Sequence, residues 1–196
     1  NSGTGKTYFA NSILKQVVKE SKGQVNFIFL DFKGITEEDE KRNSDFFNAT
    51  NCELIKAPYK PFPVNPLSFI DNINEKNKIM GINKFVDIIT SYSNIGKNQQ
   101  QTLKDVTKDV FNEVKSGAYP SFKQIYEKVL EYEGDKASTL REILESLSEL
   151  DLFETVVDTK NNFLNTNYYL SLSGDLPKSV RFTSVFLIIN YIYNTF

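Results

Sequence analysis

A short apolar run near the start of the chain does most to limit the fold. Residues 25–31 read Val-Asn-Phe-Ile-Phe-Leu-Asp, and such a run of aromatic and branched side chains is typical of a strand buried on both faces of a parallel sheet. The segment before it, from about Gly5 to Ser21, has its apolar residues at helical spacing, and Gly23 is a natural stop. A helix followed at this interval by a buried strand predicts an α/β protein.

The first seven residues contain half of a phosphate-binding motif. The full pattern is Gly, four residues, then Gly-Lys-Ser or Gly-Lys-Thr, and Gly5-Lys6-Thr7 supplies its second part. Counting back, the first glycine of the pattern would precede Asn1 by one position. Because the chain also starts without Met, we expect a segment cut inside this loop, without the strand that normally precedes it.

The residue types in this loop suit a triphosphate. Gly3 and Gly5 allow backbone angles at which successive N–H groups converge on phosphate oxygens, and the following helix points its positive end at the same place. Lys6 reaches the β- and γ-phosphates, and Thr7 offers a hydroxyl to Mg²⁺. We therefore predict ATP and Mg²⁺ as cofactors; the alternative is a chance glycine-rich turn before a helix. The predicted binding residues are Ser2, Gly3, Thr4, Gly5, Lys6 and Thr7.

Asp31 ends the predicted strand and is followed by Phe32-Lys33-Gly34. In parallel sheets, ligand chemistry gathers at the carboxyl ends of the strands, so Asp31 is a candidate to hold a Mg²⁺-bound water or to orient the attacking water. Lys6 and Asp31 are the predicted catalytic residues, and Thr7 and Asp31 the predicted metal ligands. The alternative is that Asp31 only caps a turn made by Gly34.

The segment after this turn offers weaker signals. Residues 35–51 are polar and charged, and they predict a solvated loop or a short exposed helix. Glu53–Lys56 suits a short strand. Four of the six prolines then fall within Ala57–Pro66, which is predicted to be extended and non-helical. Within it, Tyr59 and Phe62 either contact a nucleotide base or pack in the core.

Residues 74–153 show helical periodicity throughout. Four helices are predicted, each with one apolar stripe, and we expect them to pack together as a small subdomain. The second is predicted to be capped by Asn98 and to end at Gly117, and the third to begin with a capping box of Ser121 and Gln124. The predicted helices are Glu75–Asn94, Gln99–Ser116, one from Ser121 to Gly134, and one that carries Leu140–Leu150.

The last part of the chain is predicted to return to α/β character. Tyr168–Leu172 is a strand candidate, and Val156-Val157 is a shorter one. The final helix is predicted to have Asp175 as its cap and Pro177 in its first turn. The stretch from 180 to 196 is apolar nearly all round but too short to span a membrane, so we expect a helix buried against the sheet.

The composition narrows the chemistry available to the site. The chain has no His and a single Cys, Cys52, which excludes His-based triads, His metal ligands, an intrachain disulfide and a Cys-only metal cage. Cys52 itself is predicted to be a small buried apolar residue. The formal net charge is −2, so no overall basic field attracts nucleic acid. With neither a signal peptide nor a membrane span in the sequence, we expect a cytoplasmic location.

Three segments together resemble the FtsK/HerA superfamily of DNA-pumping ATPases. They are residues 1–7 (NSGTGKT), 29–34 (FLDFKG) and 61–67 (PFPVNPL). In that superfamily a turn like Asp-Phe-Lys-Gly follows the second strand, and a segment like Asn-Pro-Leu leads into an inserted helical subdomain. Residues 170–177 are similar to the strand and helix that precede the family's Walker B strand. The chain looks closest to HerA-like ATPases, including the DptH type linked to phosphorothioation-dependent DNA restriction.

This resemblance implies a P-loop NTPase of the RecA or FtsK/HerA type, with a parallel-sheet core and an inserted all-α subdomain. Residues 1–67 would be the first part of the ATPase core, 68–153 the helical subdomain, and 154–196 the return to the core. The resemblance also implies ATP hydrolysis between the subunits of a ring, expected to be a homo-hexamer, with DNA threaded through its channel. No Walker B acid occurs before Phe196, so we expect the segment alone to hydrolyse ATP poorly.

Two other functions remain open on the sequence alone. The chain can be a P-loop ATPase that acts in secretion or signalling rather than on DNA. It can also be a non-enzymatic module that binds partners through residues 74–153, with a P-loop remnant that is only structural. Arg42, Arg141 and Arg181 are each either an arginine finger for a neighbouring subunit or a surface charge.

Overall fold

The computed structural model describes residues 5–115, 117–134, 136–155 and 163–195, and every structural statement below concerns those residues. The chain forms two compact units. The sheet unit is drawn from Asn1–Lys60 and Thr159–Gly174, and the helical unit from Pro61–Asp158 and Asp175–Phe196. Both units are discontinuous in the sequence. The predicted assignment of residues 1–67, 68–153 and 154–196 to an ATPase core and its insertion stays a prediction.

Among the described residues three parallel strands form a sheet, in the order β1-β3-β2. β1 spans Ile28–Asp31, β2 spans Glu53–Ala57 and β3 spans Tyr168–Leu172. The central strand is the last of the three in the chain, and all of its residues are buried. It pairs in parallel with both neighbours, so that Asp31 and Lys56 lie in register with Ser171 on either side. The structure thus confirms the mixed α/β class, the parallel pairing and the strand predicted at residues 168–172.

β1 differs from its prediction in length and burial. It begins at Ile28 rather than at Val25, and its four residues are only partly buried, whereas the apolar run predicted a strand covered on both faces. The reason is its position, because within the described sheet β1 is an edge strand with β3 as its neighbour. An apolar run indicates a strand but does not reveal how many elements cover it.

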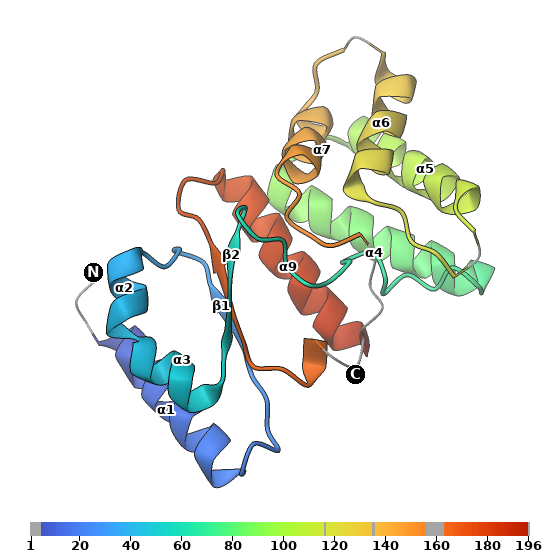
Figure 1. The fold of residues 1–196 in the computed structure, drawn as a ribbon. Coiled ribbons are helices and arrows are strands. Elements are labelled where there is room, and N and C mark those ends of the chain that lie inside the picture. Colours follow the sequence, from blue (N-terminus) through green and yellow to red (C-terminus); the bar gives the residue numbers. More distant parts are fainter. Residues whose placement is uncertain (1–4, 116, 135, 156–162, 196) are drawn as a thin grey trace. The chain divides into compact units, whose positions relative to one another are not determined.

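Helices α1, α2 and α3 belong to the sheet unit (Figure 1): α1 spans Lys6–Glu20, α2 spans Glu37–Arg42 and α3 spans Ser44–Thr50. α1 confirms its prediction. Residues 35–51, predicted as a loop or one short exposed helix, form two helices, and α3 buries Phe46. α2 has no buried residue and is stabilised locally, since four acidic residues occupy its first turn and the Thr36 side chain accepts the Asp39 N–H.

The packing of α1 does not follow its apolar stripe. α1 packs against α3, and the buried side chain of α1 is the polar Asn11, which donates a hydrogen bond to Asn43. Three apolar residues that predicted the helix, Phe9, Ile13 and Val17, are 67%, 43% and 37% exposed. The periodicity therefore located the helix correctly without identifying a buried face.

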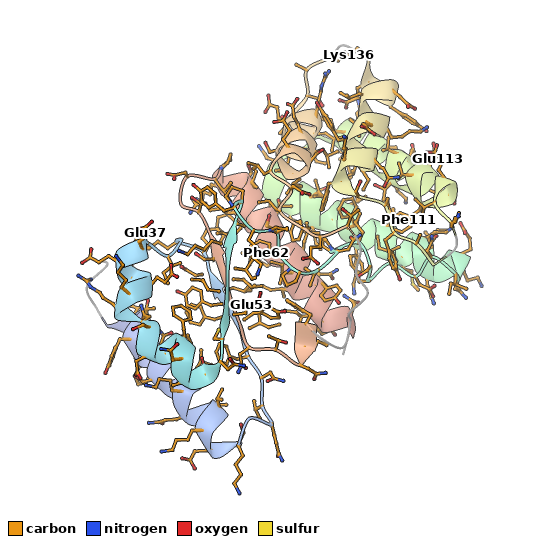
Figure 2. The ribbon with its side chains drawn as sticks, in the orientation of Figure 1. Glu37, Glu53, Phe62, Phe111, Glu113 and Lys136 are labelled. Carbon is orange, nitrogen blue, oxygen red and sulfur yellow. The ribbon has the colours of Figure 1, made fainter. Side chains whose placement is uncertain are left out.

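The helical unit contains the remaining long helices. α4 spans Glu75–Ser93, α5 spans Lys97–Glu113, α6 spans Phe122–Glu133, α7 spans Thr139–Glu149 and α9 spans Lys178–Thr195. Successive helices from α4 to α7 pack side by side, and α7 returns to α4, as predicted for these four helices. Phe62 and Phe111, labelled in Figure 2, are buried in this unit, and Glu113 at the end of α5 pairs with Lys128 of α6 at 2.8 Å.

Helix ends follow local hydrogen bonds, and the prediction for α5 is wrong at both ends. Gly96 rather than Asn98 is its cap, because the Gln99 side chain accepts the Gly96 N–H at 3.1 Å. The helix ends before Val114, which is extended, and not at Gly117. By contrast, the capping box predicted at the start of α6 is confirmed, as is the helix end at residue 134.

Helix α9 begins at Lys178, and the Pro177 carbonyl accepts the Arg181 N–H at 3.0 Å. Pro177 thus directly precedes the helix, and the cap predicted at Asp175 stays a prediction. Within the helical unit α9 packs against α4 and α7, and its predicted packing against the sheet stays a prediction. The strand predicted at Val156-Val157 lies outside the described residues. In the part of the chain that is described, no helix has both the length and the apolar character needed to cross a membrane.

Candidate functional site

The start of α1 has the backbone conformation expected of a phosphate-binding turn. Gly5 caps the helix with φ 66° and ψ 6°, a left-handed conformation that favours glycine. Its carbonyl accepts the first helical hydrogen bond, from the Phe9 N–H at 2.8 Å. Within the residues that the structure describes, no side-chain hydrogen bond caps this end, its first turn has no acidic residue, and both Lys6 and Thr7 are exposed. The N–H groups at the start of a helix have no partner within the helix and favour an anion.

The rest of the predicted loop cannot be placed in this geometry, because Ser2, Gly3 and Thr4 lie outside the described residues. Gly5, Lys6 and Thr7 are the part of the motif that the structure describes. Figure 1 shows α1 and β1 running in opposite directions within the sheet unit, so the first turn of α1 and the carboxyl end of β1 lie toward the same end of it. This is the end at which parallel sheets bind ligands.

Asp31 is the last residue of β1, as predicted, and both of its carboxylate oxygens have hydrogen-bond donors. The Lys33 N–H donates to Oδ1 at 3.0 Å, and the Ser171 hydroxyl donates to Oδ2 at 3.4 Å. The bond from Lys33 shows that Asp31 does cap a turn, which was the alternative to a role in chemistry. Since each carboxylate oxygen has more than one lone pair, the two roles are compatible.

The turn after β1 is packed tightly against the end of β3. Gly34 has φ +87°, and a Cβ placed on it would lie 2.9 Å from the Leu172 carbonyl oxygen and 3.0 Å from the Gly174 nitrogen. The Ile35 N–H next to it donates to the Ser171 hydroxyl at 2.8 Å. The glycine of Asp-Phe-Lys-Gly is therefore required both by its backbone angle and by lack of space.

Tyr169 lies close to Asp31 and was not predicted from the sequence. Its ring stacks on Phe29 with the ring centroids 4.7 Å apart, and it is buried. Burial, followed by the negative charge of Asp31 and a hydrogen bond with it, raises the pKa of Tyr169 above its usual value. Tyr169 therefore remains a neutral phenol over the physiological pH range.

Lys56 completes a polar row across the carboxyl end of the sheet, on the far side of Ser171 from Asp31. Its ammonium group forms an ion pair with Glu40 of α2. A cleft of about 530 Å³ opens beside it, lined by residues of α2, α3 and β2, among them Phe47, Leu54 and Glu37. Because both acids and lysines line this cleft, it does not select an anion, and the phosphate prediction rests on the start of α1.

The donors predicted for Mg²⁺ are chemically suitable. Thr7 offers a hydroxyl and Asp31 a carboxylate, and Mg²⁺ in nucleotide sites is held by one or two protein oxygens together with phosphate and water oxygens. Within the described ranges no cluster of three or more His, Cys, Asp or Glu side chains could hold a metal by itself. The donor set therefore fits an ion that arrives with a nucleotide better than a permanent metal centre.

The candidate arginines and aromatic residues differ in their surroundings. Arg42 pairs with Glu38, and Arg141 donates to the carbonyls of Gly134 and Lys136. Phe62 packs in the core beside Phe153, with ring centroids 5.7 Å apart, which confirms the core alternative for that residue. Tyr59 is instead 87% exposed, so the core alternative is wrong for it.

Cys52 is only partly buried, in contrast to the prediction of a buried apolar residue. Burial and then the charge of Glu53 raise the pKa of its thiol to about 12. The thiol is therefore protonated near neutral pH and is a poor nucleophile.

The fold and site together describe a mixed α/β protein with a parallel sheet, a glycine-capped helix start and an acid at a strand end. No protein-family model matches the chain, and no curated protein matches it significantly. Its function therefore has to be argued from these residues.

Proposed function

We propose that this chain is the ATP-binding and ATP-hydrolysing domain of a motor that acts on DNA as a translocase. The observation that carries the ATP part is the start of α1, where Gly5 is left-handed and Lys6 and Thr7 are exposed, with no side-chain cap among the described residues. The parallel sheet supports it, with Asp31 at the carboxyl end of a strand. The DNA part, the hexameric ring and a role in DNA restriction rest on the resemblance to the FtsK/HerA superfamily.

In this proposal each residue has a distinct task. The first-turn N–H groups of α1 bind phosphate oxygens, and the Lys6 ammonium neutralises charge on the β- and γ-phosphates. The Thr7 hydroxyl and the Asp31 carboxylate are the groups that would hold Mg²⁺ or its water. Bound Mg²⁺ would supply charge neutralisation on the phosphates.

Nucleotide binding is the first test. The chain is titrated with a fluorescent ATP analogue, with Mg²⁺ and again with EDTA. Lys6→Ala should weaken binding by about tenfold or more, since it removes a charge-assisted contact worth about 1.5–3 kcal/mol. Lys19→Ala is the matched control, an exposed lysine in the last turn of the same helix. If the two variants bind the analogue equally well, the phosphate site is not at the start of α1.

The DNA proposal needs a separate measurement. A DNA motor should bind DNA with an affinity that falls steeply as salt rises, and DNA should increase its ATP turnover. Nucleotide binding without either property would favour an ATPase of secretion or signalling. A chain with no nucleotide affinity that still binds a protein partner through residues 74–153 would favour an interaction module.

A further inference from the structure

The Ser171 hydroxyl joins the two segments that form the candidate site. It is 3% exposed on the central strand β3, in register with Asp31 of β1. It accepts the Ile35 N–H at 2.8 Å and donates to Asp31 Oδ2 at 3.4 Å. A single buried hydroxyl thus connects β3 with the end of β1 and with the turn that follows it.

In these two hydrogen bonds, Ser171 is an acceptor toward Ile35 and a donor toward Asp31. A serine hydroxyl has one proton to donate and two lone pairs. Because the Ile35 amide occupies a lone pair, the proton of Ser171 is left for the Asp31 carboxylate. The Lys33 N–H holds the other oxygen, Oδ1, at 3.0 Å. With a donor on each oxygen, the plane of the carboxylate is fixed, and the lone pairs that remain point in defined directions.

The surroundings keep this arrangement rigid. A Cβ added to Gly34 would lie 2.9 Å from the carbonyl oxygen of Leu172, the last residue of β3, so the turn has little room to shift toward that strand. Tyr169, two residues before Ser171 on the same strand, is buried against Phe29 and borders Asp31. Asp31 is therefore held by β3 as much as by its own strand.

We propose that Ser171 is a positioning residue that orients the Asp31 carboxylate for the Mg²⁺-dependent part of nucleotide binding. The inference rests on the proposed ATP site. It differs from a purely structural role, in which Ser171 would only satisfy the Ile35 amide and would affect folding without affecting Mg²⁺. Ligands of a metal are commonly oriented by such hydrogen-bonded neighbours, whose loss weakens metal affinity about 10–100-fold.

The test measures how much Mg²⁺ strengthens binding of a fluorescent ATP analogue, as the ratio of affinities with Mg²⁺ and with EDTA. Ser171→Ala should lower this ratio about tenfold while leaving the affinity in EDTA unchanged. Asp31→Asn should lower it too, and the double variant should be no worse than Asp31→Asn alone, because Ser171 acts through Asp31. Ser171→Thr, which keeps the hydroxyl, should retain the ratio.

Ser68→Ala is the matched control. Ser68 is also 3% exposed, and its hydroxyl donates a hydrogen bond to the Asn65 carbonyl in the helical unit. Thermal unfolding of all variants shows whether they are folded. If Ser171→Ala does not fold, Ser171→Cys has the same expected direction, since a thiol is a weaker donor.

The possible outcomes separate this inference from the function on which it rests. A wild-type chain that binds the analogue, with Ser171→Ala behaving like Ser68→Ala, overturns the positioning role and leaves the ATP site standing. Additive effects of Ser171→Ala and Asp31→Asn overturn it as well. A wild-type chain with no affinity for the analogue, or one whose affinity does not depend on Lys6, removes the proposed function and the inference with it.

Discussion

Asn11 of α1 donates a side-chain hydrogen bond of 2.8 Å to Oδ1 of Asn43, the residue that precedes α3. Asn11 is only 3% exposed, so water cannot replace this partner. We expect Asn11→Ala to lower the free energy of unfolding by about 1–2 kcal/mol, measured by urea denaturation. Gln16→Ala, at an exposed position of the same helix, should stay within about 0.5 kcal/mol of wild type. Equal effects of the two substitutions would contradict the role of the bond.

Gly34→Ala should destabilise the protein more than Gly23→Ala does. Both glycines have positive φ, +87° and +76°, so each substitution introduces backbone strain of about 1 kcal/mol. A Cβ at Gly34 also meets three backbone atoms of residues 172–174, at the end of β3 and just after it, whereas a Cβ at Gly23 meets nothing within 4 Å. We expect about 1–3 kcal/mol more for Gly34→Ala, again from urea denaturation. A turn that can move away from β3 would make the two costs equal.

Tyr169 should contribute to the alkaline loss of stability. Burial and Asp31 raise its pKa in the folded state, above an unfolded value of about 10. Below pH 10 the phenol is protonated in both states and adds no pH dependence. Above it, the unfolded chain releases this proton first, so stability falls as the pH rises.

Tyr169→Phe removes that contribution, so its Tm should decline less steeply than the wild-type Tm above pH 10. Tyr193→Phe, at a side chain that is 76% exposed, serves as the control and should follow the wild type. Parallel curves for wild type and Tyr169→Phe would show that Asp31 and burial do not hold the phenol neutral.

Cys52 should react slowly with iodoacetamide in the folded protein. Its thiol pKa of about 12, compared with about 8.5 for a free cysteine, lowers the thiolate fraction at pH 8 by about three orders of magnitude. The rate should rise sharply in denaturing urea, and mass spectrometry can follow both reactions. A folded-state rate close to that of the unfolded chain would mean that the thiol is neither desolvated nor influenced by Glu53.

Local sequence patterns predicted where the helices and strands form. They were less successful in predicting how buried each element is and where it ends. The spacing of apolar residues located α1, and the aromatic and branched residues of 168–172 located β3, because these signals depend on a few neighbouring residues. The burial of β1 was overestimated, because sheet order is decided by β3, which lies far away in the chain. The ends of α5 were missed because one Gln99 side chain determines where that helix begins.

In the candidate site, too, the residues marked by a local sequence pattern were predictable and the others were not. Lys6, Thr7 and Asp31 were predictable, since a motif and a strand end mark them. Ser171 and Tyr169 were not, since a serine and a tyrosine in a strand have no special pattern. Their importance arises only from a register that pairs Asp31 with a residue 140 positions later. Successive side chains of a strand point to opposite faces of the sheet. Once Asp31 is taken as a site residue and its neighbouring strand is known, every second residue of that strand is therefore a candidate to lie beside it.

The central position of β3 has a consequence for how the protein is made. β1 and β2 are not neighbours, and each has β3 as its partner in the described sheet. During synthesis, both strands therefore leave the ribosome well before the strand that joins them, with residues 58–167 emerging between β2 and β3. Pairing across such long sequence separations is slow, so the sheet unit would complete its folding after the helices α4–α7, whose contacts are more local. The nucleotide site proposed here would then be one of the last parts of the chain to form.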